Sequence, residues 1–317
     1  PMEPQNTTQV SMFVLLGFSQ TQELQKFLFL LFLLVYVTTI VGNLLIMVTV
    51  TFDCRLHTPM YFLLSCLSFV DACYSSAIAP KMLVNLLVVK ATISFSACMV
   101  QHLCFGVFIT TEGFLLSVMA YDRYVAIVSP LLYTVAMSDR KCVELATGSW
   151  IGGIVNTLIH TISLRRLSFC RLNAVSHFFC DIPSLLKLSC SDTHINEMMV
   201  FVLGGTVLIV PFLCIVTSYI HIVPAILRVR TRGGVGKAFS TCSSHLCVVC
   251  VFYGTLFSAY LCPPSIASEE KDIAAAAMYT IVTPMLNPII YSLRNSEVKN
   301  ALSRTFHKVL ALRNCIP

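Results

Sequence analysis

The chain has 317 residues, of which 56% are hydrophobic and only 11% are charged. A soluble domain carries about 25% charged residues, so this composition excludes an ordinary water-soluble protein, and it equally excludes intrinsic disorder. The net charge is +6, but the basic residues are spread along the chain rather than gathered in one patch, so we expect no nucleic-acid partner. The composition indicates an integral membrane protein that contacts membrane lipid.

Seven apolar runs, each long enough to form a membrane-spanning helix, follow one another along the chain. They predict an all-α fold, a seven-transmembrane helix bundle, because a membrane β-barrel would show short segments of alternating hydrophobicity instead. We divide the chain into an extracellular N-terminus at 1–23, a seven-helix domain at 24–294 and a cytoplasmic tail at 295–317. The predicted helices cover about residues 25–52, 58–87, 92–128, 141–164, 197–229, 237–262 and 272–293.

The placement of Lys and Arg predicts the orientation of the chain. Cytoplasmic loops carry an excess of basic residues, and Arg140, Arg228 and most tail Lys and Arg residues fall inside when the N-terminus is outside. Asn6 begins an Asn-Thr-Thr glycosylation sequon, which agrees with an extracellular N-terminus.

The chain has 15 cysteines, and most of them fall within predicted helices, where cysteine is an ordinary small apolar residue. Four others, Cys98, Cys170, Cys180 and Cys190, fall on the predicted outer side, which meets an oxidising compartment. Four cysteines allow three pairings. We predict Cys98–Cys180 with Cys170–Cys190, because the first bond would tether the long outer loop across the top of the third helix.

Two acidic residues, Asp71 and Glu112, lie in the middle of predicted spans, where a charge is costly and usually functional. Two interpretations remain open from their spacing alone. They either share a cation, most plausibly sodium, or remain protonated and hydrogen-bond to neighbouring helices. The third helix also carries Arg123 at its inner end, either as an anchor that reaches toward the interface or as a switch beside Asp122.

Four segments make the chain resemble the vertebrate olfactory receptors of the tetrapod type, within the rhodopsin-like G-protein-coupled receptors. They occur in the expected order, one for each expected helix or loop. The segments are 56–62 (LHTPMYF), 119–127 (MAYDRYVAI), 237–242 (KAFSTC) and 284–291 (PMLNPIIY).

The resemblance implies a multi-pass glycoprotein of the plasma membrane, with no enzymatic activity, that binds a small odorant. It implies coupling to the heterotrimeric olfactory stimulatory G protein, which raises cyclic AMP. No cofactor is required, although the resemblance favours the sodium interpretation for the Asp71 and Glu112 pair. The residues implied in G-protein coupling and activation are Asp122, Arg123, Tyr124, Tyr219, His245, Asn287, Pro288 and Tyr291.

The resemblance also implies a ligand pocket in the outer halves of helices three, five, six and seven. None of its residues carries a fixed charge, which indicates a mainly apolar cavity for a neutral volatile. His102 is the nearest titratable side chain and could recognise a polar group, or it could merely contact loop residues. The implied ligand-binding residues are His102, Phe105, Gly106, Ile109, Thr110, Gly205, Thr206, Tyr253, Leu256, Phe257, Tyr260 and Tyr279.

Residues 296–310 place apolar side chains on one face and basic side chains on the other, which predicts a short amphipathic C-terminal helix on the inner leaflet.

Three other protein classes compete with the olfactory-receptor interpretation. A transporter would show an inverted repeat, and we find none. A membrane enzyme would show a catalytic motif such as H-E-x-x-H, which is also absent. A rhodopsin-like receptor of another branch remains the nearest alternative.

Overall fold

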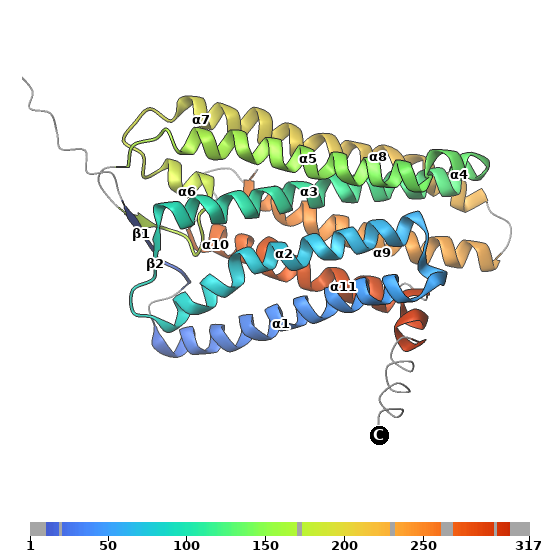
Figure 1. The fold of residues 1–317 in the computed structure, drawn as a ribbon, viewed down its shortest axis with the longest axis horizontal. Coiled ribbons are helices and arrows are strands. Elements are labelled where there is room, and N and C mark those ends of the chain that lie inside the picture. The colour runs from blue at the N-terminus through green and yellow to red at the C-terminus, as the bar shows by residue number, and fades with distance from the viewer. Residues whose placement is uncertain are drawn as a thin grey trace, which may run out of the picture.

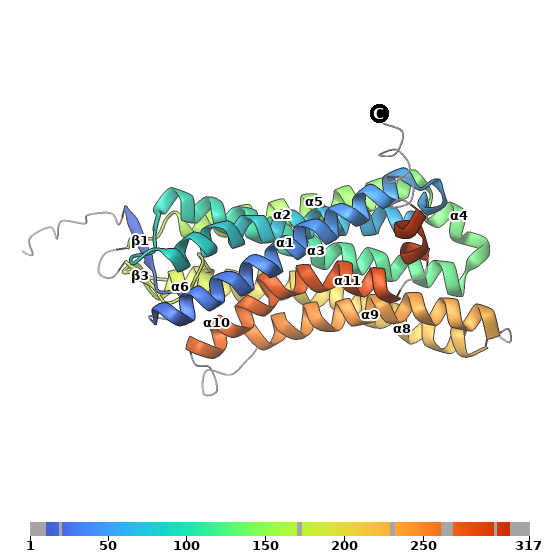
Figure 2. The ribbon, with the colours of Figure 1, turned by 90° about the horizontal axis from the view of Figure 1, so that it is seen from below.

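The computed structural model describes residues 11–18, 21–169, 173–228, 232–260, 269–294 and 297–304. Among these residues, seven helices are long and apolar enough to cross a membrane, and they run alongside one another as a bundle (Figures 1 and 2). The first five spans are α1 (Gln22–Phe52), α2 (Pro59–Leu87), α3 (Phe95–Val128), α5 (Asp139–Leu164), and α7 (His194–Met199) continuing through the π-helical turn η3 (Val200–Gly204) into α8 (Gly205–Arg228). The last two are α9 (Arg232–Tyr260), and α10 (Glu269–Ala277) continuing through the π-helical turn η4 (Met278–Val282) into α11 (Thr283–Arg294).

The sides of the bundle, which would face the lipid, are apolar, as a bilayer requires. On α1 the side chains of Leu30 and Leu34 are 66% and 65% exposed, and on α8 Leu227 is 79% exposed. In water such a surface would aggregate, whereas in a bilayer it is the favourable face. Polar residues such as Asn43, Asp71 and Glu112 are instead fully buried between the helices.

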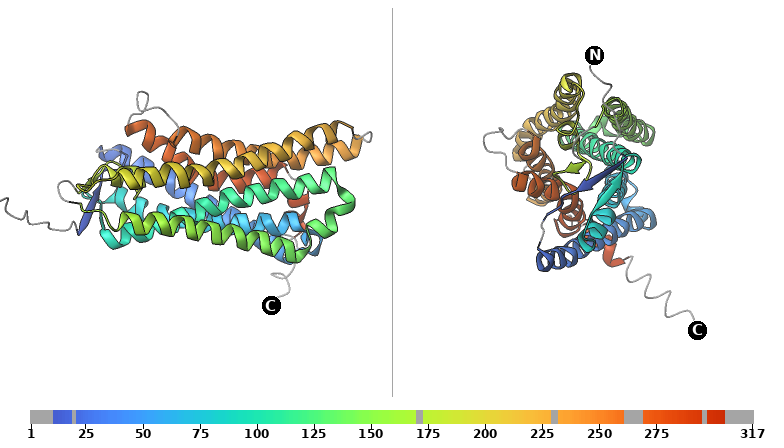
Figure 3. Two further views of the ribbon diagram at one scale, coloured as in Figure 1. Left: turned by 90° about the horizontal axis from the view of Figure 1, so that it is seen from above. Right: turned by 90° about the vertical axis from the view of Figure 1, so that its left-hand side faces the viewer.

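Helix α3 lies at the centre of the bundle and contacts α2, α5, α8 and α9 (Figure 3). It begins where the hydroxyl of Ser94 accepts a hydrogen bond from the backbone N–H of Ala97, at 3.2 Å, which caps the first turn. The predicted third helix started at residue 92, but residues 92–94 form a strand. Because α3 is 34 residues long and contacts four other spans, its side chains line the interior of the bundle along most of its length.

A small three-stranded sheet, which the hydrophobic runs did not predict, covers the end of the bundle where α1 and α3 begin. We call this the outer end and the opposite end the inner end, after the orientation predicted from the basic residues. Strand β1 (Met12–Leu15) pairs antiparallel with β2 (Thr92–Ser94) and parallel with β3 (Ala174–Val175). Phe13 of β1 is fully buried against Phe95 and Phe169, with ring centroids 6.1 and 5.5 Å away. Strand β1 is therefore packed onto the outer loops.

Two spans contain π-helical turns, η3 and η4, where single continuous helices were predicted. A π turn widens the helix by one residue and is frequent at functional sites. Both turns lie in the outer halves of their spans. The fifth and seventh spans thus change their helical register where the ligand residues were predicted.

Two short connections complete the inner end. The chain passes from α1 to α2 through a 3₁₀ turn, η1 (Cys54–Leu56), and from α3 to α5 through η2 (Pro130–Leu132) and α4 (Tyr133–Ala136).

Residues 297–304 form a short helix that contacts the inner ends of α1 and α2. The Tyr61 hydroxyl donates to Glu297 at 2.6 Å, and the Arg304 guanidinium pairs with Asp53 at 2.7 Å. The Arg304 hydrogen bond holds the pKa of Asp53 below its usual value. The rest of the predicted amphipathic helix, residue 296 and residues 305–310, lies outside the described residues.

Candidate functional site

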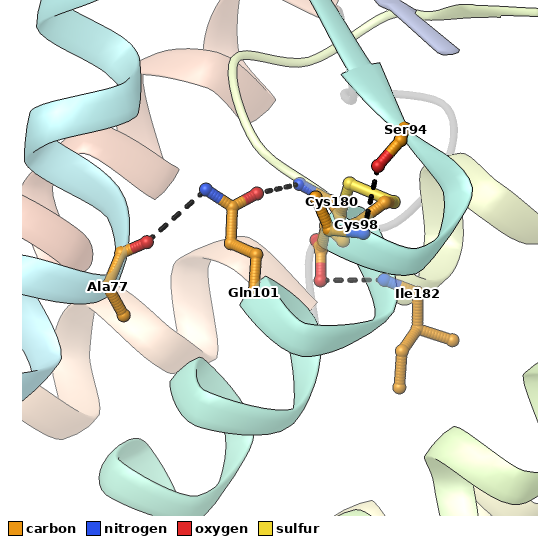
Figure 4. The surroundings of a disulfide bond; sticks show 8 residues. Ala77, Ser94, Cys98, Gln101, Cys180 and Ile182 are labelled. Carbon is orange, nitrogen blue, oxygen red and sulfur yellow. Dashed lines mark hydrogen bonds between the residues drawn. A yellow bond between two sulfur atoms is a disulfide. The ribbon is translucent and has the colours of Figure 1, made fainter. Parts of the chain in front are cut away.

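The long outer loop is fixed to α3 by the Cys98–Cys180 disulfide, which confirms that predicted pairing (Figure 4). Gln101, one turn below Cys98, accepts a hydrogen bond from the Cys180 backbone N–H at 3.1 Å and donates to the Ala77 carbonyl of α2 at 3.3 Å. Cys190 is disulfide-bonded, while its predicted partner Cys170 lies outside the described residues.

The disulfide places the loop segment 177–179 directly over the helices. Phe179 is fully buried, and its ring centroid lies 5.1 Å from that of Phe105 on α3. Phe178 stacks on Phe18 at 4.6 Å. Burial lowers the pKa of His177 to about 4, so this ring is neutral at pH 7. No sequence motif indicated these residues, although their position next to Cys180 was an available signal.

Three predicted ligand residues meet in one aromatic cluster at the outer end. Tyr279 of η4 lies 6.2 Å from Phe105 and 6.1 Å from Tyr260 of α9, between ring centroids. Tyr74 of α2, which was not predicted, stacks on Phe105 at 5.5 Å and donates its hydroxyl to the Tyr279 carbonyl at 2.8 Å. The cluster therefore connects α2, α3, α9 and η4.

A second aromatic group lies deeper in the bundle. Tyr253 and Phe257 of α9 pack against Phe212 of α8, with ring centroids 5.1 Å from Phe212 in both cases. The Tyr253 hydroxyl donates to the Gly113 carbonyl on α3 at 3.4 Å, and Leu256 is buried beside it. Phe212 was missed because its position in α8 depends on the helical register after η3.

Several predicted ligand residues lie away from both aromatic groups. A Cβ on Gly106 would stand 2.5 Å from Thr157 Cγ2, so Gly106 lies against α5. Thr110 also turns toward α5, where Asn156 donates to its hydroxyl at 3.5 Å. Thr206 is exposed, and its hydroxyl donates to the Val202 carbonyl one turn before it. Ile109 is half-buried against the core, and a Cβ on Gly205 would meet nothing within 4 Å.

A buried carboxyl group, Asp181, lies at the outer end beside the aromatic cluster. Its Oδ1 accepts hydrogen bonds from the Ile182 N–H at 2.9 Å, at the start of α6 (Ile182–Leu186), and from the Tyr260 hydroxyl at 3.4 Å. Burial, helped by the nearby Asp272, raises the pKa of Asp181 to about 6. The predicted pocket contained no acid, because the loop position of Asp181 depends on the disulfide.

The two membrane acids meet at the centre of the bundle. The Asn287 amide of α11 donates to Asp71 Oδ2 at 2.9 Å and to Glu112 Oε1 at 3.2 Å. Three oxygens at this site, Asp71 Oδ1, Glu112 Oε2 and Asn287 Oδ1, are buried without a hydrogen-bond partner. Carboxylate and amide oxygens are the ligands that hard cations prefer. The residues present therefore fit a small cation.

Asp122 and Arg123, two of the predicted residues at the inner end of α3, border a cavity of about 470 Å³. Arg123 is 4% exposed, and its Nε has no hydrogen-bond partner. Asp122 accepts from the Tyr133 hydroxyl of α4 at 2.9 Å. Tyr61 and Glu297 line the same cavity, so the C-terminal helix borders it too.

Tyr219 of α8 and His245 of α9 form a hydrogen-bonded pair next to α3. His245 Nε2 lies 3.0 Å from the Leu116 carbonyl, and its Nδ1 lies 2.9 Å from the Tyr219 hydroxyl. A carbonyl only accepts, so Nε2 carries the proton, and in the neutral ring Nδ1 accepts from Tyr219. Three helices are joined by this pair.

The other predicted activation residues lie nearby on α3 and α11. Tyr291 is 1% exposed, and its hydroxyl has no partner. Tyr124 packs against His221 of α8, with ring centroids 5.9 Å apart. Pro288 lies close to α1, where a Cβ on Gly42 would be 3.0 Å from its Cγ. The predicted glycosylation residue, Asn6, lies outside the described residues.

A seven-helix bundle with a loop tethered over its outer end, a central acidic pair and a buried arginine at its inner end defines a rhodopsin-like membrane receptor. Squid rhodopsin has the same fold, with a TM-score of 0.67 and 18% identity over 92% of this chain and 87% of that one. The family model for olfactory receptors matches residues 32–309.

Individual relatives agree with that match over nearly their full length. The chain is 66% identical to human Olfactory receptor 5J2, covering 96% of this chain and 97% of that protein. It is 63% identical to human Olfactory receptor 1N1, covering 95% and 97%, and 53% identical to Olfactory receptor 1f45 of Rattus norvegicus, covering 98% of each.

The chain belongs to the olfactory receptor family. It is therefore a multi-pass plasma-membrane receptor that responds to odorants through a G protein. Its family has no enzymatic activity and requires no cofactor.

Proposed function

We propose that this receptor binds a small neutral volatile in the outer half of the bundle and activates the olfactory stimulatory G protein, raising cyclic AMP. The observation that carries the proposal is the aromatic cluster of Phe105, Tyr260 and Tyr279, which offers ring faces and hydroxyl groups but no cation to pair with an acidic ligand. The acid beside it, Asp181, would repel a carboxylate ligand further. His102, Leu256, Tyr253 and Phe257 complete this ligand site in our proposal.

The inner cavity supports a G-protein site on the cytoplasmic side. The proposed orientation places the N-terminus outside, because the basic residues of the inner loops, such as Arg140 and Lys141, lie at the opposite end from the disulfide-tethered loop. Arg123 borders the cavity and has an unpartnered donor, so a G-protein backbone carbonyl could accept from it. Tyr219 and Tyr291 would then move beside Arg123 on activation.

A sodium ion in the acidic core would stabilise the resting receptor. The support for this proposal is the set of three unpartnered buried oxygens from Asp71, Glu112 and Asn287. A monovalent cation would neutralise part of the charge of two carboxylates that share one amide donor. No catalytic or covalent step is involved.

Cyclic AMP measured in cells that express the receptor with the olfactory stimulatory G protein tests the proposal. A panel of neutral and carboxylic-acid volatiles is applied to the wild type, Arg123→Ala and Phe105→Asp, all matched for surface expression. We expect neutral volatiles to act on the wild type and on the control Phe105→Leu, which keeps an apolar side chain, but not on Arg123→Ala or Phe105→Asp. A response carried by acids, or one that survives Arg123→Ala, contradicts the proposal.

A further inference from the structure

Two buried histidines lie near each other, one in the outer part of α3 and one in the outer part of α5. His102 is 3% exposed, and neither of its ring nitrogens has a hydrogen-bond partner. His160 is 7% exposed and lies close enough to His102 for the two rings to interact electrostatically. A buried polar group without a partner is costly, so such a group usually has a function that explains it.

The packing below the histidines fixes their separation. Helices α3 and α5 approach closely at two glycines, where an added Cβ on Gly106 or Gly153 would stand 2.5 Å from a threonine side chain of the other helix. His102 is one turn outward from Gly106, and His160 is about one turn outward from Thr157, the residue that Gly106 meets. Both histidines therefore lie about one helical turn outward of the same close contact, each within a long helix rather than in a loop.

The histidine pair borders the proposed ligand site. His102 precedes Gly106 by four residues, about one helical turn, so both leave α3 on the side that meets α5. It precedes Phe105 of the aromatic cluster by three residues, which places the two on adjacent parts of that face. A ligand that rests on Phe105 would thus carry its polar group within reach of His102.

The chemistry of two neutral imidazoles selects the polar group. Each neutral ring has one N–H donor and one acceptor nitrogen. A hydroxyl group both donates and accepts one hydrogen bond, so it can bond to both rings at once. An ether or a carbonyl can only accept, and a hydrocarbon can do neither.

We propose that His102 and His160 form the polar subsite of the ligand pocket and select volatile alcohols over ethers and hydrocarbons of the same shape. The inference rests on the proposed odorant function and adds a ligand class to it. It assigns a role to His160, which no motif indicated, and to Gly106, which positions the pair instead of touching the ligand.

Matched ligand pairs test the subsite. Linear alcohols of five to ten carbons, cyclohexanol and 2-phenylethanol are each compared with their own methyl ethers in the cyclic AMP assay. We expect at least one alcohol to act at a concentration about tenfold or more below its ether. That preference should collapse in His102→Ala and in His160→Ala, because the alcohol response should fall about tenfold more than the ether response, which loses at most one accepted hydrogen bond.

Two further variants and one added reagent distinguish hydrogen bonding by the histidine pair from a general loss of function and from metal binding by the pair. His102→Gln keeps a donor and an acceptor and should retain part of the preference, and the exposed His194→Ala at the same end of the bundle should retain all of it. Flow cytometry of a surface tag matches receptor amounts. Addition of a metal chelator should leave the preference unchanged.

Several results would overturn the subsite. They are an alcohol preference that persists in both alanine variants, alcohol and ether responses that fall together, a chelator that removes the preference, or no alcohol that exceeds its ether. If no volatile at all evokes a response that Arg123→Ala abolishes, the proposed odorant function fails first and the subsite falls with it.

Discussion

The buried carboxyl group of Asp181 should make the stability of the receptor depend on pH. It is 8% exposed, and its Oδ1 accepts hydrogen bonds from the Ile182 N–H and the Tyr260 hydroxyl. These bonds favour the charged form, but burial and the nearby Asp272 oppose it more strongly. Asp181→Asn keeps an oxygen that can accept from Ile182 and removes the titration.

The sign and size of the effect follow from the pKa values. The pKa rises from 3.8 for an ordinary Asp to about 6 in the folded protein. Between about pH 4 and pH 6 the folded protein holds a proton that the unfolded chain has released, so stability falls as pH rises through this window. A difference of about two pKa units corresponds to at most about 3 kcal/mol. Above pH 6 the loss is complete.

The single tryptophan, Trp150, supplies the signal for a thermal-unfolding assay. It packs between Phe69 and Phe108, so unfolding should change its fluorescence. About 2 kcal/mol of this loss falls between pH 4.5 and pH 7.5, so we expect the wild type to lose about 4 °C in melting temperature, relative to Asp181→Asn, over that range in detergent. Because each pH compares two proteins, contributions from other titrating groups largely cancel. A difference in melting temperature that does not vary with pH would refute the reasoning.

Three other predictions concern the loop, the α3–α5 contact and the acidic core. His177 has a pKa lowered to about 4, so the wild type should lose stability as pH falls from about 6.5 to 4, and His177→Gln should lose less; equal pH profiles would contradict this. Gly153→Ala forces a methyl group to 2.5 Å from the Thr111 hydroxyl and should cost about 1–3 kcal/mol, seen as a lower melting temperature. Gly148→Ala, where the methyl group meets nothing within 4 Å, should be neutral or stabilising, and equal losses in both variants would refute the packing argument. Replacing sodium by choline should lower the melting temperature of the wild type but not of Glu112→Gln, and a decrease in both would argue against the cation site.

The spans could be predicted because a bilayer imposes a simple requirement. Every backbone polar group must be satisfied within its own helix, so uninterrupted apolar runs of about 20 residues become helices whatever their partners are. The outer sheet could not be predicted in this way. Strand β1 has four residues, and its pairing partners near residues 93 and 174 are distant in the sequence. Only the folded bundle brings those segments together.

The candidate site was predictable where a residue type is rare in its surroundings. Asp71, Glu112 and Arg123 are conspicuous in apolar helices, and all three prove to be buried between helices. Pocket residues were harder to predict, because successive positions on a helix differ in direction by 100°. Phe105 and Gly106 are neighbours in the sequence, yet Phe105 joins the aromatic cluster while Gly106 meets α5. Loop residues such as Phe179 and Asp181 depend on a disulfide whose geometry the sequence does not contain.

The contacts of α9 suggest how a ligand at the outer end could reach the inner cavity. Tyr253 bonds to the Gly113 carbonyl, one residue after Glu112, and Glu112 shares the Asn287 amide with Asp71. A ligand that displaces Tyr253 therefore disturbs α3 directly beside the acidic core. Asn287 is one turn before Tyr291 on α11, and Tyr291 lies close enough to Arg123 to interact with it electrostatically.

This chain of contacts constrains the ligand as well as the receptor. A ligand shifts the equilibrium only by the difference between its affinities for the resting and active arrangements. Contacts with His102 and His160 on the rigid α3–α5 side would be alike in both arrangements, so they would set affinity and ligand class. Contacts with Tyr253 and Phe257 on α9 would differ between the arrangements, and these should set efficacy. Substitutions at His160 should therefore shift the effective concentration of an alcohol, while Phe257→Ala should lower its maximal response.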